Sequence, residues 1–126
     1  MKPETKAFLE KAHHTLDAAR RDRDAADADH AVSHAYYATY YAATAALNEV
    51  DLTAKTHKGT HTFFYQQYVE SRKIAEHHHH AFSRLFQLRQ DVDYAFSIGI
   101  LPLETAITAI EQAEAFVEAV AALLSS

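Results

Sequence analysis

The amino-acid sequence predicts an all-α protein, an up-down bundle of about five helices. There are two glycines and two prolines among 126 residues, while alanine, leucine, glutamate, glutamine and arginine are plentiful. This composition favours helices and leaves few residues for tight β-turns. Apolar residues also recur every three or four positions along most of the chain, which is the period of an amphipathic helix. The length suits one domain, so we expect residues 1–126 to form a single unit.

The first helix is expected over residues 2–23, because Pro3 is tolerated in a first helical turn. Residues 20–29 are charged and rich in alanine and include no large apolar side chain. We therefore expect the helix to fray there, before Asp27 or Asp29 caps the next helix. The apolar positions at helical spacing are Phe8, Leu9, Ala12, Leu16 and Ala19.

The second helix is expected over residues 27–50, where the apolar spacing continues for six turns. Its many alanines would let a neighbouring helix approach closely. A second stripe on this helix is polar and aromatic, and we expect it to face a partner rather than solvent. These side chains could stack on a base or bond to a ligand, or they could fill a helix interface with their hydroxyls at its wet edge. The stripe consists of Ser33, Tyr37, Tyr41 and Thr44.

Three shorter stretches complete the expected bundle. Residues 51–56 form a loop, and Thr56 can cap a third helix that carries residues 63–71. The fourth helix is expected over residues 76–96, and the fifth begins at Pro102.

Arg89 stands out on the fourth helix because of its spacing. It follows Phe82 by seven residues, which is close to two helical turns. Its guanidinium should therefore lie on or beside the apolar packing face.

Charge and composition exclude several classes of function. The net charge of −5 argues against nucleic-acid binding by bulk electrostatics and leaves only a local basic patch. Cysteine is absent, so neither a disulfide nor a thiolate metal site can form. The first ten residues lack the apolar centre of a signal peptide, and no apolar stretch approaches about 18 residues. We expect a soluble, cytoplasmic protein.

The ten histidines raise the question of a metal. His30 and His34 are spaced four residues apart on an expected helix, as are His57 and His61, and such pairs can chelate zinc. No carboxylate-containing motif completes either pair, and the tract 77–80 is of a kind that usually lies on a solvated surface. We therefore expect no metal and no cofactor.

Three segments together resemble the HEPN family of small helical-bundle proteins. Residues 33–43, Ser-His-Ala-Tyr-Tyr-Ala-Thr-Tyr-Tyr-Ala-Ala, resemble the family helix Ser-Arg-Ala-Tyr-Tyr-Ala-Met-Phe-His-Ala-Ala. Thr-His-Lys-Gly at residues 56–59 and Leu-Phe-Gln-Leu-Arg-Gln-Asp-Val-Asp-Tyr at residues 85–94 follow in the expected order. The resemblance covers nearly the whole chain.

The resemblance implies a bundle of about five helices, often dimeric and often encoded beside a minimal nucleotidyltransferase as a toxin-antitoxin pair. Active members resemble metal-independent ribonucleases whose signature is an arginine followed after four to six residues by a histidine. Arg89 matches this arginine, but Tyr94 stands five residues on. A phenol with a pKa near 10 is poorly suited to acid–base catalysis at neutral pH. The second helix departs as well, with His34 where arginine is common and Tyr41 where histidine is common.

The candidate site has two interpretations. Arg89 could bind a phosphate while Asp93, one turn on, orients it and Tyr94 donates a hydrogen bond. Alternatively, Arg89 and Asp93 form an ion pair that only anchors a helix or dimer contact. His57 and Lys58 could add anion-binding donors at a helix start, or they could serve capping and solvation.

Our first hypothesis is a HEPN-type module, homodimeric, that binds a nucleotidyltransferase partner or a nucleotide or phosphate ligand in a cleft near Arg89. The second is a ribonuclease toxin in which Arg89 and Tyr94 replace the usual pair. The third is a structural helical protein without a ligand.

Overall fold

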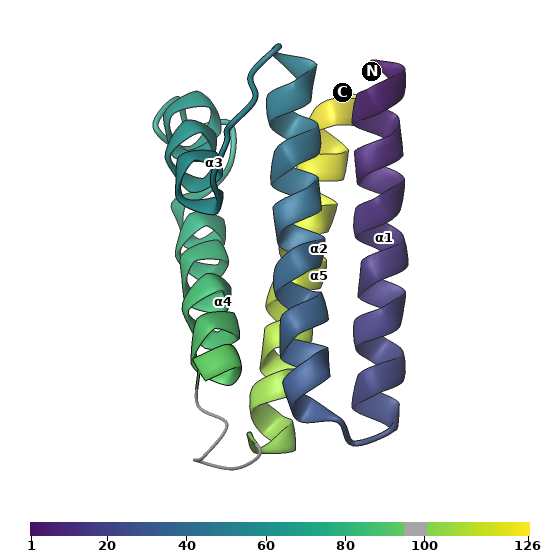
Figure 1. Cartoon of the computed structure of the whole chain (residues 1–126). Coiled ribbons are helices and arrows are strands. Elements are labelled where there is room, and N and C mark those ends of the chain that lie inside the picture. The colour runs from purple at the N-terminus through teal and green to yellow at the C-terminus, as the bar shows by residue number, and fades with distance from the viewer. Residues whose placement is uncertain (95–100) are drawn as a thin grey trace.

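The computed structural model describes the backbone of residues 1–94 and 101–126 and, within these ranges, every side chain except that of Tyr94. All regular structure in these ranges is helical, which confirms the all-α prediction (Figure 1). None of these helices combines the length and apolar character needed to cross a membrane. The elements are α1 (Pro3–Asp24), α2 (Ala28–Glu49), α3 (His57–Phe64), the π-helix η1 (Tyr65–Val69), α4 (Glu76–Tyr94) and α5 (Leu103–Ser125).

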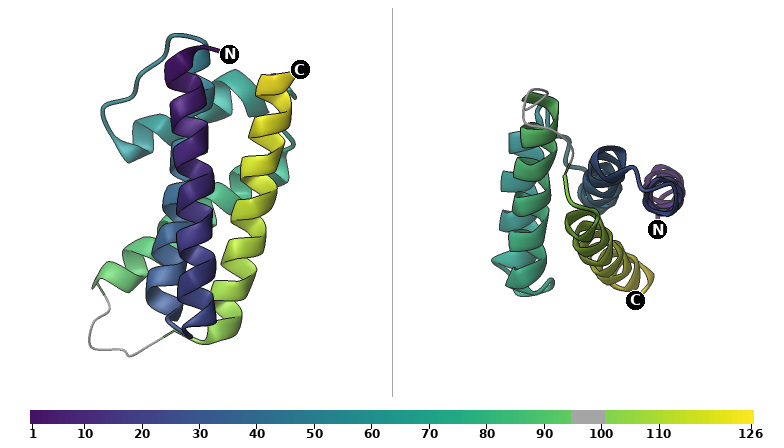
Figure 2. Two further views of the ribbon diagram at one scale, coloured as in Figure 1. Left: turned by 90° about the vertical axis from the view of Figure 1, so that its right-hand side faces the viewer. Right: turned by 90° about the horizontal axis from the view of Figure 1, so that it is seen from below.

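Helix α2 is the centre of the arrangement. The long helices α1, α2 and α5 lie side by side, and both chain termini lie at the same end of this group (Figure 1). Helices α3 and α4 form a second layer against α2, and α4 crosses the long helices at a slant (Figure 2). Each of the other α-helices packs against α2.

The sequence of α2 explains how it serves four neighbours. Small side chains occupy its buried positions, so neighbouring helix backbones can approach closely, as expected from its alanines. Close packing of this kind leaves little room for a larger side chain. The alanines of α2 that are completely buried are Ala31, Ala35, Ala38, Ala42, Ala43, Ala45 and Ala46.

Large aromatic rings fill the space between the two layers. Phe116 of α5 packs against Phe82 of α4, with ring centroids 5.1 Å apart, and against Phe64 of α3 at 5.2 Å. All three rings are fully buried. This cluster fixes the position of α4, and hence of Arg89, relative to the long helices.

Side chains cap the starts of three helices. As expected, Asp27 accepts a hydrogen bond from the backbone of α2, and Thr56 accepts one from Gly59 N at 2.9 Å in α3. The cap of α1 comes from another helix, because Glu49 at the end of α2 accepts from Lys2 N at 3.0 Å. A carboxylate is favoured at this position by the helix dipole.

The first helix was expected over residues 2–23, and α1 spans Pro3–Asp24. Two details of the helix ends were wrong. Helix α1 does not fray after Arg20, whose guanidinium bonds to Glu114 of α5 at 2.5 Å. Pro102 precedes α5 as its N-cap instead of lying in its first turn. The expected third helix is present, and its hydrogen bonding becomes π-helical at Tyr65. The expected end of the fourth helix at Phe96 and most of the following loop lie outside the described residues.

We expect Ala35→Leu to lower the free energy of unfolding by about 1–3 kcal/mol, because the extra carbons have no room in a filled helix interface. Ala35 is 0% exposed. Urea denaturation followed by circular dichroism measures the effect. Ala7→Leu, which adds the same atoms to an exposed position of α1, serves as the control. Equal stability of the two variants would contradict the close packing of α2.

Candidate functional site

Tyr36 joins the three helices around the candidate site. Its side chain is 0% exposed on α2, and its ring packs against Phe86 of α4 at a centroid distance of 5.4 Å. The hydroxyl lies 2.7 Å from His57 Nδ1 and 3.5 Å from His61 Nε2, both on α3. Burial raises the pKa of the Tyr36 phenol, so the hydroxyl stays protonated and can both donate and accept.

His57, the first residue of α3, is held in a fixed orientation. Its half-buried imidazole stacks on the Tyr40 ring at 4.2 Å with an interplanar angle of 13°, and it also lies parallel to Phe86 at 5.9 Å. Burial lowers the pKa of His57, and the positive charge of Arg89 lowers it further. The imidazole is therefore neutral at neutral pH. Its Nδ1 is engaged by Tyr36, and none of the hydrogen bonds within the described ranges involves its Nε2.

Arg89 lies at the edge of the same aromatic cluster. Its guanidinium carbon is 5.2 Å from the centre of the Tyr37 ring, and Nη2 is 3.1 Å from Asp93 Oδ2. The side chain remains 26% exposed. The spacing argument thus placed Arg89 correctly, beside the packing face with access to solvent. The ion pair with Asp93 involves one of the three guanidinium nitrogens, so other N–H donors remain for a ligand.

The structure brings some of the candidate residues together and separates others. Arg89 and Asp93 are paired, and Tyr37 lies beside both Arg89 and His57. Tyr41 packs against Tyr37 with ring centroids 6.1 Å apart, but the Lys11 ammonium of α1 also lies over its ring at 4.4 Å. Three further candidates contribute less. Ser33 is half-buried one turn before Tyr37, Lys58 lines a neighbouring groove, and the side chain of Tyr94 lies outside the described residues.

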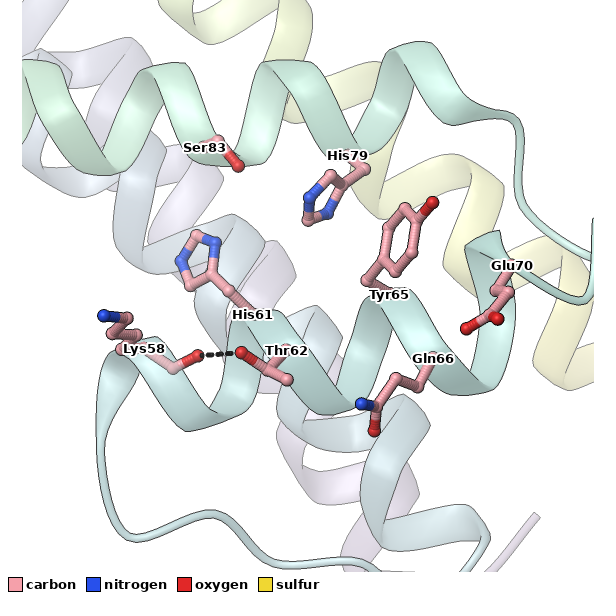
Figure 3. Close-up of a pocket in the computed structure, with 8 residues that line it drawn as sticks. All are labelled: Lys58, His61, Thr62, Tyr65, Gln66, Glu70, His79 and Ser83. Atoms are coloured by element: carbon pink, nitrogen blue, oxygen red, sulfur yellow. Dashed lines mark hydrogen bonds between the residues drawn. The ribbon is translucent and has the colours of Figure 1, made fainter.

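A groove of about 340 Å³ runs between α4 and the α3–η1 segment (Figure 3). His61 of α3 and His79 of α4 point toward each other across it, with Lys58 at one end and Glu70 at the other (Figure 3). Burial, followed by the neighbouring His79 and His57, lowers the pKa of His61 to about 4. His61 lies between this groove and Tyr36, so it connects the groove to the Arg89 region.

Sequence reasoning missed His79, which belongs to the tract 77–80. We expected a solvated surface there, but the tract lies on α4, where successive residues point in different directions. His78 and His79 are half-buried while His77 and His80 are exposed. Burial lowers the pKa of both His78 and His79.

The paired histidines do not gather into a metal site within the described residues. His30 bonds to Asp27 at 2.7 Å, and His34 bonds to Asp22 of α1. No group of three or more histidine, aspartate or glutamate side chains in the described ranges has a metal-binding arrangement.

We expect acidification to destabilise the fold through the histidines whose pKa is lowered by burial, which are His57, His61, His78 and His79. Free histidine has a pKa of about 6.5, so the unfolded chain binds protons at a higher pH than the folded one, and stability falls between about pH 6.5 and about pH 4. His61 alone, with its pKa of about 4, should cost about 2–3 kcal/mol between about pH 7 and about pH 4.5. Urea titrations at both pH values measure this loss.

His61→Leu should reduce the loss, whereas His14→Leu on the exposed face of α1 provides the matched control. If the His61 variant loses as much stability on acidification as the wild type, the buried imidazole is not its source.

Comparison with known proteins identifies the family of the chain. The model of the HEPN domain matches residues 5–123. A UPF0332 protein of Gloeobacter violaceus is 30% identical over 118 residues, which cover 94% of each chain. A protein of Methanocaldococcus jannaschii that is named as a candidate toxin is 26% identical over 99 residues, which cover 79% of this chain and 67% of that one. The chain therefore belongs to the HEPN domain family.

Proposed function

We propose that this HEPN domain binds a phosphate group of RNA or of a nucleotide through Arg89. The observation that carries the proposal is the placement of the guanidinium, which lies on the Tyr37 ring beside the neutral His57 imidazole and keeps solvent access. A guanidinium binds phosphate through paired N–H donors. The half-buried tyrosine rings nearby could stack on a base.

Asp93 influences how tightly Arg89 can bind a phosphate. Its carboxylate holds Arg89 in one orientation and also neutralises part of its charge. The chain as a whole is acidic, with a net charge of −5. Binding should therefore be local and only weakly dependent on salt, because few phosphates can be neutralised at once.

Arg89→Ala should weaken binding of a short single-stranded RNA about tenfold or more, because it removes charge-assisted hydrogen bonds worth roughly 1.5–3 kcal/mol. Fluorescence anisotropy at low salt measures the change. Arg84→Ala is the matched control, since Arg84 is an exposed arginine of the same helix that bonds to Gln112. Asp93→Asn should strengthen binding by removing a competing negative charge.

If Arg89→Ala and Arg84→Ala bind RNA equally, Arg89 is not the phosphate ligand. Loss of thermal stability in the Arg89 variant without any loss of affinity would instead identify the Arg89–Asp93 pair as a structural anchor.

The proposal extends to assembly. We infer a homodimer in which two Arg89 faces line a shared cleft, and a minimal nucleotidyltransferase as the partner protein. The support is the family membership together with the half-exposed aromatic and polar surface that Tyr37 and Arg89 present.

Sedimentation equilibrium at micromolar concentration should give twice the chain mass of 14.1 kDa. A mass of one chain would exclude the shared cleft. A nucleotidyltransferase reading frame beside the gene would support the partner, and a pull-down with that protein would test it directly.

A second function is favoured by one specific observation, the contact of the Tyr37 ring with both the His57 imidazole and the Arg89 guanidinium. Metal-independent RNA cleavage needs an acid–base group near neutrality and a cation to stabilise the phosphate, and these two side chains supply them. The relative named as a candidate toxin agrees with such an activity.

Wild-type protein incubated with RNA in the presence of EDTA should cleave it, and Arg89→Ala should not. Intact RNA after incubation with the wild type, or equal cleavage by the variant, would exclude the ribonuclease function.

A further inference from the structure

We propose that His57, which is on a different helix from Arg89, is the general base that removes the 2′-hydroxyl proton during RNA cleavage, and that Tyr36 positions it. This inference rests on the second proposed function, ribonuclease activity. It assigns the acid–base role within this chain to α3, whereas the position five residues after Arg89 on α4 carries a tyrosine.

The geometry around His57 supports a base of fixed orientation. Stacking on Tyr40 at 4.2 Å holds the imidazole plane, and the Tyr36 hydroxyl at 2.7 Å from Nδ1 fixes its rotation. A base held by a third group in this way is a recurring arrangement in enzymes that activate hydroxyl nucleophiles. Nε2, the nitrogen that Tyr36 does not bind, is the atom available for the substrate.

His61 helps to decide which nitrogen of His57 carries the proton. With its pKa of about 4, His61 is neutral at neutral pH, so its Nε2 can accept a hydrogen bond from the Tyr36 hydroxyl across 3.5 Å. The Tyr36 oxygen then accepts from His57 Nδ1–H. This tautomer leaves the lone pair of His57 on Nε2, as a base requires.

The chemistry balances without a metal or another reactant. Nε2 of His57 takes the 2′-hydroxyl proton while the 2′ oxygen forms a bond to phosphorus and the bond from phosphorus to the 5′ oxygen breaks. The imidazolium returns that proton, directly or through water, to the departing 5′ oxygen. One product ends in a 2′,3′-cyclic phosphate and the other begins with a 5′-hydroxyl. Arg89 stabilises the negative charge that grows on the phosphate oxygens.

The charged and titratable groups facing His57 come from three helices. Tyr36, Tyr37 and Tyr40 of α2 present phenols, Arg89 of α4 presents a positive charge, and His61 belongs to α3 itself. Burial, followed by the positive charge of Arg89, lowers the pKa of His57, so the base form should persist below the ordinary pKa of histidine.

The experiment measures RNA binding and RNA cleavage on the same variants in EDTA. His57→Gln should lower kcat about 100-fold or more, the range expected for loss of a general base, while its RNA affinity changes little. His14→Gln, at an exposed histidine, serves as the control. A DNA strand of the same base sequence, which has no 2′-hydroxyl, should bind but stay intact. Mass spectrometry of the cleaved RNA should find the cyclic phosphate.

Two further readouts separate catalysis from folding. In the pH profile of kcat/KM, the fall at acidic pH should be present in the wild type and absent in His57→Gln. Tyr36→Phe, which keeps the ring, should lower kcat with little change in KM and shift the pH of that fall. If His57→Gln does not fold, as judged by its melting temperature, His57→Asn is measured in the same assays.

The outcomes are distinguishable. If the wild type binds RNA through Arg89 but does not cleave it, the proposal of phosphate binding stands. The same result overturns both the ribonuclease function and the role of His57. Wild type that cuts RNA while a folded His57 variant cuts equally well overturns only the His57 proposal. Loss of cleavage and of RNA affinity in the same His57 variant would also overturn it, since the residue would then act in binding.

Discussion

The hydrogen bond between the Tyr36 hydroxyl and His57 Nδ1 ties the central helix α2 to α3, and the Tyr36 ring packs on α4. A buried phenol needs a partner for its hydroxyl, because an unpaired polar group in the core costs free energy. The need is met by imidazoles instead of a backbone carbonyl. The same contact that stabilises the junction therefore holds an acid–base side chain in place beside Arg89.

The packing of α2 makes this junction possible. Its buried alanines bring the neighbouring helices close, and its Tyr36 contacts both α3 and α4. On the other side of the bundle, Asp29 accepts from Leu101 N at 3.1 Å and Arg20 bonds to Glu114, so polar contacts hold the register of the long helices. The slanted layer of α3 and α4 (Figure 2) carries His57, His61, the tract 77–80 and Arg89.

Histidine has two different roles in this chain. Two histidines with accessible side chains, His30 and His34, bond to the nearby carboxylates Asp27 and Asp22. The buried His61 is kept neutral by its surroundings, stacked on Phe82 with centroids 3.6 Å apart. The cost of protonating such groups links the integrity of the site to pH. Counting histidines in the sequence gives no indication of this difference, because it depends on burial.

Features that depend on neighbours along the chain could be predicted from the sequence. Helix spacing, the caps at Asp27 and Thr56 and the side of α4 on which Arg89 lies all follow from hydrogen bonds and periodicity within a few residues. Only the tertiary structure brings His57 and Arg89 to the same Tyr37 ring, Lys11 to Tyr41, and His61 to the groove that His79 also lines. These contacts join different helices, so they depend on how α1, α3 and α4 pack against α2.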